Sequence, residues 1–306
     1  MQKNKFAIFD YVKNRNEIDI KFPTIKKMPD FILHWYIKKF CPLTIKNIDL
    51  DLANAYFVKL PIEKKENNNL YAHEIFIKAI KKLGDLDIIK CPSEFIPDAN
   101  KYKIAVSDGT YLFAFVIIDA IKNILLDIKK ELSECEIFVL DNDFYLTNIL
   151  LDNICEHVNY LSIITNQKNL YKKKEQEIFV NTGLNINVMK YKKNTISEAD
   201  IIINNNFDED FIYAIKKNAL YFELKNTNRQ NYCNEIKLKR PDVLVFDKLN
   251  LIYKNHFFDN NILEMLFYCI DHNFKKCFMG KYNKDSCQEI RNKIEELGIK
   301  ISSCQK

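Results

Sequence analysis

Glycine is scarce in this 306-residue sequence. The glycines number 5, namely Gly84, Gly109, Gly183, Gly280 and Gly298, whereas an average chain of this size has about 21, at roughly 7% of residues. Sites that hold phosphates through backbone amides need glycine for close approach and for positive φ. The scarcity therefore argues against a glycine-rich phosphate-binding loop.

Arginine is nearly as rare, and lysine supplies 42 of the 46 basic residues. The arginines are Arg15, Arg229, Arg240 and Arg291. Nucleic-acid sites depend on arginine for bidentate contacts, and the basic run 172–174 falls on an expected helix beside Glu175 and Glu177, as on a solvated helix face. Despite the net charge of +5, we therefore expect no nucleic-acid partner.

The sequence also lacks long apolar runs and paired cysteines. No run approaches the ~20 residues that cross a bilayer, so we expect no transmembrane segment. The apolar stretch 6–9 is interrupted by Asp10 and is too short for a signal peptide. The 9 cysteines are odd in number and have no paired spacing, which is typical of a reducing compartment. We expect a cytoplasmic protein long enough for two domains.

The first part of the chain mixes helical and strand-like patterns. We expect helices at 31–40, 69–83 and 110–132, and strands at 55–60, 87–90 and 102–106. Residues 1–132 are predicted to form a mixed α/β domain that resembles a substrate lobe. Its long apolar helix, 110–132, is interpreted as packing between two lobes.

From Glu136 onwards, strands and helices alternate regularly. We expect strands at 136–140, 160–165, 185–190, 199–204, 219–224 and 242–246, with helices at 144–158 and 168–182. This alternation predicts a doubly wound parallel, Rossmann-like sheet over residues 133–257, with 136–140 as a central strand. Helices at 260–271 and 286–297 predict a C-terminal segment, 258–306, that packs back on the N-terminal lobe.

The strand 136–140 is followed by the turn that opens a dinucleotide-binding βαβ unit. This turn normally carries the pattern G-x-G-x-x-G, which lets the backbone approach a pyrophosphate. Here it reads D-N-D-F-Y-L, so that Asp141, Asn142 and Asp143 are followed by Phe144 and Tyr145. We expect two unpaired carboxylates that repel a phosphate and two bulky side chains that keep it away. The frame of an NAD(P) domain is thus predicted without its phosphate cradle.

Several segments match the sequence pattern of one family. They are R-P-D-V-L-V-F at 240–246, A-D-I-I-I at 199–203, A-I-K-K-L-G at 79–84, S-D-G-T at 107–110 and L-E at 263–264. In these segments the chain resembles the long-chain acyl-[acyl-carrier-protein] reductases and the related predicted amino acid dehydrogenases. Those proteins share their architecture with shikimate dehydrogenase and glutamyl-tRNA reductase. The resemblance extends over nearly the whole chain, and 240–246 is its most specific part.

The resemblance implies a lobe that binds NADPH and a cysteine nucleophile three residues before a glutamate in the closing helix. If Glu264 is that glutamate, the nucleophile position falls on Asn261, which cannot form a thioester. The family's glycine turn falls on residues 141–146, and its Gly-Gly pair falls on Lys248 and Leu249. Three functional sites are replaced while the packing strands persist, which we interpret as the mark of a catalytically degenerate member.

The end of the second strand of the βαβ unit is a candidate for a cofactor contact. NADP-using relatives often read N-R at this place, where the arginine meets the 2′-phosphate. Asn166 matches this pattern and Gln167 does not. Lys168 or Lys172 offers positive charge, but the two carboxylates of the nearby turn oppose it. We therefore interpret this segment as an ordinary loop.

The cysteines near the expected closing helix suggest two further functional arrangements. Cys269 is a candidate for a displaced nucleophile, but five residues after Glu264 it lies about 500° around a helix and leaves the face of Asn261. Cys269, His272 and Cys277 have near-ligand spacing, but structural zinc takes four ligands. We interpret Cys269 as a small core residue and predict no metal site.

The patterns together predict a two-lobed α/β protein, related in fold to shikimate dehydrogenase and closed by C-terminal helices. We predict a non-catalytic binding or scaffold protein without a cofactor, whose ligand is an unidentified protein, acyl group or small molecule. The alternative is an NAD(P)H-dependent oxidoreductase that uses NADP and acts on an acyl or amino-acid-like substrate. No catalytic residue is predicted, and cofactor binding discriminates between the two hypotheses.

Overall fold

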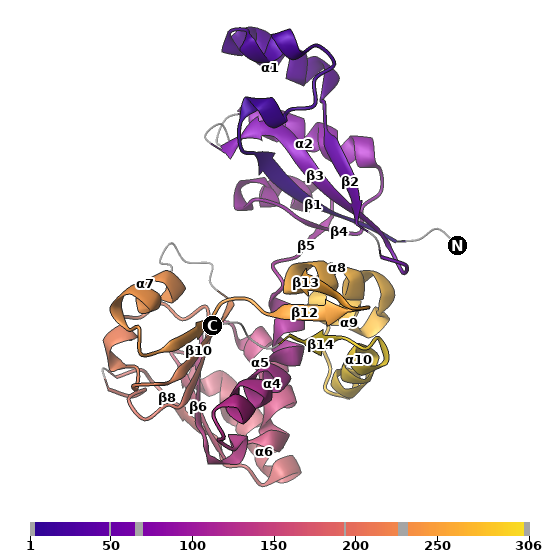
Figure 1. Ribbon diagram of the computed structural model, residues 1–306. Helices are drawn as coiled ribbons and strands as arrows, with labels where there is room; N and C mark the ends of the chain where they lie inside the picture. Colours follow the sequence, from indigo (N-terminus) through magenta and orange to yellow (C-terminus); the bar gives the residue numbers. More distant parts are fainter. Residues whose placement is uncertain (1–3, 49, 65–69, 193, 226–231, 303–306) are drawn as a thin grey trace. The chain divides into compact units, whose positions relative to one another are not determined.

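The computed structural model describes residues 4–48, 50–64, 70–192, 194–225 and 232–302 (Figure 1). The chain divides into two compact units. Unit 1 comprises Met1–Asp108 and Glu264–Lys275, and unit 2 comprises Gly109–Leu263 and Lys276–Lys306. The three-part division inferred from the sequence, with boundaries at 132 and 257, stays a prediction. Residue 69, the expected start of a helix, lies outside the described residues.

Unit 1 is built on a five-stranded sheet in the order β2-β3-β1-β4-β5. The strands are β1 (Lys5–Val12), β2 (Thr44–Ile48), β3 (Asn54–Glu63), β4 (Ile88–Lys90) and β5 (Ala105–Val106). Its helices are α1 (Asp30–Phe40), α2 (Leu70–Leu83) and α3 (Ile96–Lys101). The β2–β3 pair is antiparallel and the other pairs are parallel. The structure thus confirms the helices expected at 31–40 and 69–83 over their described residues, and the strand expected at 55–60.

The central strand of unit 1, β1, is not predicted from the sequence. Its apolar run is interrupted by Asp10, whose side chain faces solvent, whereas Tyr11 and Val12 beyond it are buried. The interruption is therefore one outward position of a strand with a period of two. The edge strand β2 is also missed, because three of its five residues are exposed and no apolar periodicity marks it.

Unit 2 contains a six-stranded sheet in the order β11-β10-β9-β6-β7-β8, and every described pair in it is parallel. Its strands are β6 (Glu136–Asp141), β7 (Tyr160–Thr165), β8 (Asn187–Met189), β9 (Ile201–Asn205), β10 (Leu220–Lys225) and β11 (Leu244–Phe246). Counted along the chain, this is the order 3-2-1-4-5-6 of the Rossmann fold. The predicted parallel sheet with 136–140 in a central position is confirmed.

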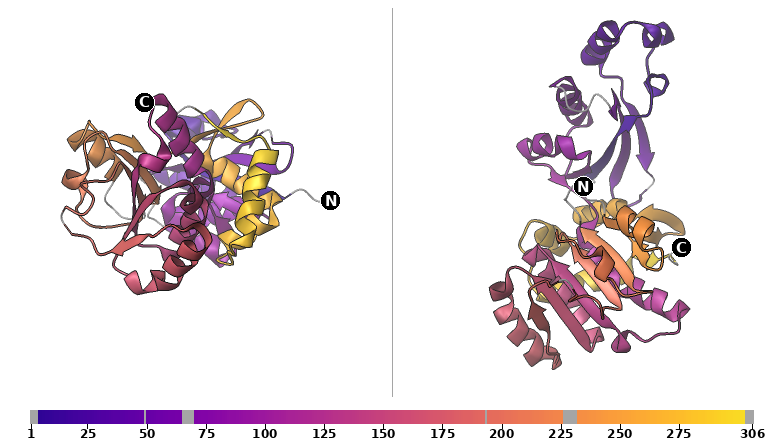
Figure 2. Two further views of the ribbon diagram at one scale, coloured as in Figure 1. Left: turned by 90° about the horizontal axis from the view of Figure 1, so that it is seen from below. Right: turned by 90° about the vertical axis from the view of Figure 1, so that its left-hand side faces the viewer.

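Both faces of the six-stranded sheet are covered (Figures 1 and 2). Phe138 and Leu140 of β6 pack into a core cluster that includes residues of α7 (Tyr232–Lys239), while their neighbours Ile137 and Val139 on the opposite face are fully buried too. Strands buried on both faces read as continuous apolar runs. This is why the strands of unit 2 are recognisable in the sequence.

The other helices of unit 2 largely follow the sequence prediction. They are α4 (Thr110–Asp127), α5 (Phe144–Ile154), α6 (Lys172–Thr182) and α10 (Asp285–Glu296). The helices expected at 144–158 and 168–182 are each an α-helix joined to a short 3-10 turn, at Cys155–His157 and Lys168–Tyr171. The helix expected at 110–132 ends at Asp127, because Lys129 takes a φ of 55°. No helix among the described residues is both long and apolar enough to span a membrane.

Unit 2 also contains a small antiparallel sheet, formed by its C-terminal part. Its strands are β12 (Asn250–Tyr253), β13 (His256–Asp259) and β14 (Lys300–Ile301). The β12–β13 hairpin is not predicted from the sequence, because its two-residue turn is Lys254-Asn255, with φ values of 49° and 65°, where glycine is the usual signal. Helix α8 (Asn260–Ile270) follows β13, and α9 (His272–Phe278) comes next.

The basic run 172–174 is not entirely solvated, and this expectation is wrong. Lys174 is only 5% exposed, and its Nζ lies 2.6 Å from Asp152 Oδ1 and 3.2 Å from Glu177 Oε1. Asp152 also accepts a hydrogen bond from the hydroxyl of Tyr282 at 2.8 Å. A helix turns by about 100° per residue, so the third lysine of the run faces inward while the first faces solvent.

Candidate functional site

The candidate site lies where the carboxyl ends of β6 and β9 meet the N-terminus of α5. In open α/β sheets, ligands bind beyond the carboxyl ends of the strands, at the point where the strand order reverses. In unit 2 this point is flanked by β6, β9 and β7. Rossmann proteins place a pyrophosphate on the N-terminus of the helix that follows the first strand, which here is α5.

The N-terminus of α5 is capped by a side chain of the chain itself. Asp143 is the N-cap residue, and its Oδ1 accepts a hydrogen bond from the backbone N–H of Leu146 at 3.2 Å. Its other oxygen, Oδ2, lies 2.7 Å from Nζ of Lys225 at the end of β10. A carboxylate at this place satisfies a helix donor and interacts favourably with the helix dipole. These are the two interactions that a phosphate normally makes at such a site.

Asp141 completes this arrangement from beneath the turn. Its side chain is 2% exposed, and its Oδ1 accepts hydrogen bonds from the N–H of Asp143 at 3.0 Å and from Oγ1 of Thr147 at 2.6 Å. Thr147 in turn accepts a hydrogen bond from Nδ2 of Asn205 at 2.7 Å. The same Nδ2 lies 3.0 Å from the carbonyl oxygen of Asp143, and the N–H of Asn142 donates to the carbonyl of Asn205. The turn is thus held in one closed network.

The sequence predicts two unpaired carboxylates in this turn, and this prediction is wrong. Asp143 pairs with Lys225, and Asp141 accepts hydrogen bonds from a backbone amide and a hydroxyl. Lys225 comes from β10, 82 positions from Asp143 in the sequence, whereas both donors to Asp141 lie within six positions of it. The turn thus places a carboxylate of its own, that of Asp143, at the first turn of α5.

The aromatic residues of the turn are engaged in packing. The ring of Phe144 meets the buried ring of Tyr171 edge-on, with centroids 5.0 Å apart. The hydroxyl of Tyr145 donates to the carbonyl of Cys277 at 2.5 Å and accepts from the N–H of Tyr282 at 2.9 Å. Burial, with the nearby charge of Asp141, holds the pKa of Tyr171 well above its ordinary value. The phenol therefore stays protonated beside the turn.

One buried polar atom near the turn, Oδ1 of Asn205, has no hydrogen-bond partner among the described residues. The hydroxyl of Tyr171 is buried beside Asp141 and Thr147. Both side chains are fully buried, and unpaired buried polar atoms cost free energy. A further polar group that reached Oδ1 of Asn205 would be stabilised there.

The end of β7 presents exposed polar side chains. Asn166 and Gln167 both face solvent, and the N–H of Gln167 donates to Oγ1 of Thr165 at 3.0 Å in a local turn. Lys168 and Lys172 are exposed as well. The contact of Asn166 or Gln167 with a cofactor stays a prediction.

In unit 1, the glutamate of the closing helix forms a buried pair with a residue of the matching S-D-G-T segment. Glu264 is fully buried, and its Oε1 accepts a hydrogen bond from the hydroxyl of Ser107 at 2.6 Å. These residues are 157 positions apart in the chain. Two segments that are far apart in the sequence thus meet in space.

In unit 2, the start of α8 packs tightly on a glycine. Gly109 takes a φ of 82° and precedes α4, and Nδ2 of Asn260 donates to its carbonyl at 3.0 Å. A Cβ at Gly109 would lie 2.6 Å from Nδ2 of Asn260 and 3.1 Å from Cγ of Asn261. Asn261 is 6% exposed, and its correspondence to a nucleophile position stays a prediction.

We expect Gly109→Ala to destabilise unit 2 clearly more than Gly183→Ala. Both glycines have a φ near 80°, but a Cβ at Gly183 meets nothing within 4 Å. The left-handed backbone costs about 1 kcal/mol for alanine at either place, and the clash with Asn260 adds about 1–3 kcal/mol. Urea unfolding followed by far-UV circular dichroism measures both. Equal losses of stability would show that the start of α8 does not press on Gly109.

The cysteines near the closing helix are buried thiols. Burial, with the nearby charge of Asp87, raises the pKa of Cys269 to about 12, so the thiol is protonated near neutral pH. Cys277 is 1% exposed. Within the part of the chain that the structure describes, no three His, Cys, Asp or Glu side chains are grouped so as to hold a metal ion.

One polar network of unit 2 is missed in the sequence. Glu223 on β10 is 8% exposed and accepts hydrogen bonds from the Tyr221 hydroxyl at 2.5 Å, from Nδ2 of Asn204 at 3.1 Å and from the Cys233 thiol at 3.5 Å. Burial raises the pKa of Glu223 to about 7. The only signal in the sequence is a single acidic residue inside an otherwise apolar strand.

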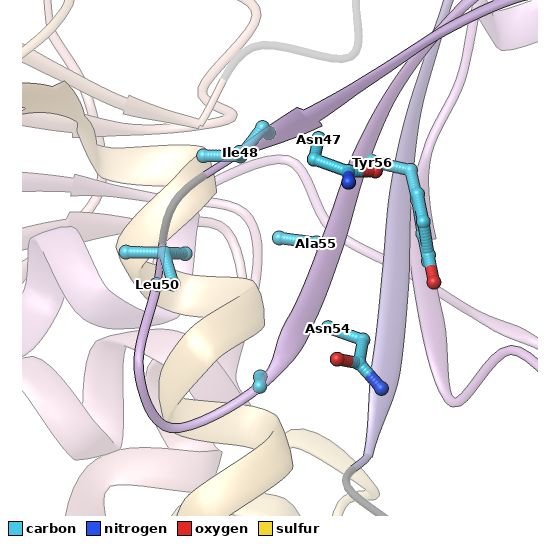
Figure 3. Close-up of a pocket in the computed structure, with 7 residues that line it drawn as sticks. Asn47, Ile48, Leu50, Asn54, Ala55 and Tyr56 are labelled. Atoms are coloured by element: carbon cyan, nitrogen blue, oxygen red, sulfur yellow. The ribbon is translucent and has the colours of Figure 1, made fainter.

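Unit 1 contains hollows of its own (Figure 3). One, of about 310 Å³, is lined by residues of β2, β3 and their connection, including Asn47, Asn54 and Tyr56. A second, of about 450 Å³, lies at the carboxyl ends of β1 and β3. Its lining includes Asp10, Lys13, Glu63 and Lys64. These hollows have the size of small-molecule sites, and the second also offers charges of both signs.

The strand order of unit 2 defines the Rossmann class of fold. A scan against models of protein families found no match, and neither did a search of curated proteins. Among solved structures, the chain is similar to L-tryptophan dehydrogenase from Nostoc punctiforme, with 14% identity, a TM-score of 0.37, and coverage of 97% of this chain and 83% of that chain.

Two further solved structures show the same level of similarity. Shikimate 5-dehydrogenase from Listeria monocytogenes, in complex with shikimate and NAD, has 10% identity, a TM-score of 0.34 and coverage of 94% and 96% of the two chains. Quinate dehydrogenase from Corynebacterium glutamicum, in complex with NAD, has 9% identity, a TM-score of 0.35, and coverage of 96% of this chain and 100% of that chain. These structures are dehydrogenases, but similarity this low says nothing about activity, so the fold assignment rests on the strand order.

Proposed function

We propose that this protein is a non-catalytic binding protein built on a two-domain dehydrogenase fold, in which the cofactor site is closed by the chain itself. The observation that carries this proposal is the capping of α5 by Asp143, with Asp141 buried beneath it. Both carboxylates occupy the place where a pyrophosphate meets the helix in Rossmann proteins. The turn also lacks the glycines that such contact requires.

A pyrophosphate that approaches α5 must displace Asp143 from the N–H of Leu146 and from Lys225. It also meets the carboxylate of Asp141, for which no cationic partner is present among the described residues. Two like charges about 4 Å apart repel by about 4 kcal/mol at an effective dielectric constant of 20. Lys225 offsets part of this repulsion at Asp143. It pairs with Oδ2 of that carboxylate, however, whereas Oδ1 is the oxygen that caps the helix.

The acyl-transfer half of the family chemistry is also unsupported by the residues present. The relation to acyl-[acyl-carrier-protein] reductases, which the sequence suggests, puts Asn261 at the position of the nucleophile, and a neutral amide forms no thioester. The thiol of Cys269 is buried and has a raised pKa, whereas reactive cysteines have a lowered pKa and partial exposure. We infer that the protein forms no acyl-enzyme and acts by binding, with the charged hollow at Asp10 and Lys13 as a candidate ligand site.

The second candidate function is an NAD(P)H-dependent oxidoreductase with an altered turn, which uses NADP and acts on an acyl or amino-acid-like substrate. Two observations favour it. The six-stranded sheet has the strand order of dinucleotide-binding domains, and Oδ1 of Asn205 is a buried acceptor without a partner among the described residues at the edge where a cofactor binds. A cofactor that lies away from the capped helix start would leave Asp143 in place.

A thermal-shift panel with NADPH, NADH and a long-chain acyl thioester tests the proposal. We expect neither nucleotide to change the Tm, because a ligand stabilises only a protein that binds it. Hydrolysed NADPH serves as a control for nonspecific ionic effects. A rise in Tm with intact NADPH, together with NADPH oxidation in the presence of the thioester, would replace this proposal by the oxidoreductase.

A further inference from the structure

Large apolar side chains are exposed along one short stretch of unit 1, from Phe22 to Phe40. Phe31 is 72% exposed, Trp35 59%, Phe22 55%, Phe40 52% and Met28 41%. Exposed apolar residues are normal when they are scattered singly, but a group of them marks an interaction site. We call these five residues the α1 face; they share one segment rather than one side of a helix, because Phe22 and Met28 precede α1 and Phe40 lies about 180° around the axis from Phe31. Helix α1 is visible at one end of unit 1 in Figure 1.

The sequence of α1 explains why these side chains point outward. Leu33, Tyr36 and Ile37 form the inner stripe of the helix and pack into the core of unit 1. Phe31 and Trp35 are four residues apart and therefore lie on one common side, which the core leaves uncovered. The helix thus has an apolar inner stripe and an aromatic outer one.

Lysines surround the α1 face. Lys39 Nζ lies 5.0 Å from the ring centroid of Trp35 and 5.5 Å from that of Phe40, and Lys21 Nζ lies 5.8 Å from that of Phe22. Residues 19–40 contain five lysines and two aspartates. One of the aspartates, Asp30, pairs with Arg15. One of the lysines, Lys38, pairs with Glu74, and the others leave the surroundings of the exposed aromatic rings positively charged.

We propose that the α1 face binds an anionic lipid bilayer surface, with its aromatic side chains in the headgroup region. Helices that lie in a membrane interface combine Trp, Phe or Leu on one side with lysine beside it. Lysine stems pack on apolar surface while their ammonium groups reach lipid phosphates, and each lysine near an anionic surface contributes to the attraction. The α1 face has each of these features.

Charge argues against the other occupants of this face. A second copy of the chain across a two-fold axis would bring the same patch onto itself, and thus lysines onto lysines. A nucleic acid would gain stacking on aromatic rings, but arginine, which reads phosphates and bases in two-pronged contacts, is represented in unit 1 only by Arg15, which is paired with Asp30. An anionic surface that also accepts Phe and Met is the partner that fits best.

Trp35 provides a direct probe, because it is the only tryptophan in the sequence. We expect vesicles of phosphatidylglycerol and phosphatidylcholine to shift its fluorescence emission to shorter wavelength in a saturable manner. Pure phosphatidylcholine vesicles should shift it little, and salt should weaken the effect because it screens charges. Co-sedimentation with the vesicles provides a readout that does not depend on Trp35.

Variants separate the proposal from nonspecific adsorption. Phe31→Ser and Lys39→Glu should each weaken vesicle binding about tenfold or more, because Phe31 loses its buried apolar surface in the bilayer and Lys39 changes sign at an anionic surface. Leu126→Ser is the matched control, since Leu126 is 74% exposed on α4, and it should bind as the unaltered protein does. All three sites are exposed, so the variants should fold.

Several results would overturn the proposal. One is an unchanged Trp35 spectrum and no co-sedimentation with anionic vesicles. Another is equal binding by Phe31→Ser and Leu126→Ser. A third is a shift of the Trp35 emission caused by single-stranded RNA at concentrations where vesicles have no effect. A fourth is a dimer that the Phe31→Ser substitution dissociates. Each of these last two results would assign the α1 face to a different occupant.

Discussion

Replacement of Lys174 by methionine is expected to lower the free energy of unfolding by about 3–5 kcal/mol. The Lys174 side chain is 6% exposed and that of Asp152 is 3% exposed, and Nζ lies 2.6 Å from the carboxylate. Methionine keeps much of the packing but leaves Asp152 as a buried charge whose remaining described partner is the Tyr282 hydroxyl. An unpaired buried charge costs far more than an ion pair contributes.

Two further variants test the reason for this loss. Lys172→Met changes an exposed lysine of the same helix and should change stability by less than about 0.5 kcal/mol. The double variant Lys174→Met/Asp152→Leu removes both charges and should recover most of the loss. Urea unfolding followed by far-UV circular dichroism measures all three. A loss below about 1 kcal/mol in Lys174→Met would show that Asp152 and Lys174 are solvated in solution.

Ionisation of Glu223 is expected to lower the free energy of unfolding as the pH rises from about 4.5 to above 7. Burial raises the pKa of this carboxyl from 4.5 to about 7, so between these values the folded state binds more protons than the unfolded state. Stability from this group is therefore fully present below pH 4.5 and is lost as the pH rises through 7. The whole effect is on the order of 3 kcal/mol.

The variant Glu223→Gln isolates this titration. Glutamine keeps the shape of the side chain and has no charge to gain, so the pH dependence of its unfolding free energy lacks the Glu223 contribution. The difference between the two proteins should change by on the order of 3 kcal/mol across this range, while other groups, such as His157, whose pKa is lowered chiefly by burial, cancel. Urea titrations at a series of pH values measure it. A constant difference would mean that Glu223 titrates as an exposed carboxyl does.

The parallel sheet of unit 2 is predictable from the sequence because its strands are buried on both faces. Ile137 and Val139 are as buried as Phe138 and Leu140, which leaves an unbroken apolar run. In β1, by contrast, Asp10 faces solvent and interrupts the run. The β12–β13 hairpin escapes prediction because Lys254 and Asn255 adopt a left-handed turn without glycine.

The place of the candidate site follows from the sequence, but its chemistry does not. The position of the turn between β6 and α5 is set by the apolar run and the helical period after it. The side chains that hold the turn in place are Lys225, Asn205 and Thr147, and the first two belong to strands β10 and β9. Only the register of β9 and β10 against β6 brings them together, and a single sequence does not contain that register.

The central claim is that the carboxylates of Asp141 and Asp143 close the site where a dinucleotide phosphate would bind. Isothermal titration calorimetry with NADPH tests it most directly. We expect no saturable heat at NADPH concentrations up to about 1 mM, which corresponds to a binding free energy weaker than about −4 kcal/mol. A saturable isotherm with a Kd in the low micromolar range would contradict the claim, because it would show that the two carboxylates do not keep the dinucleotide out.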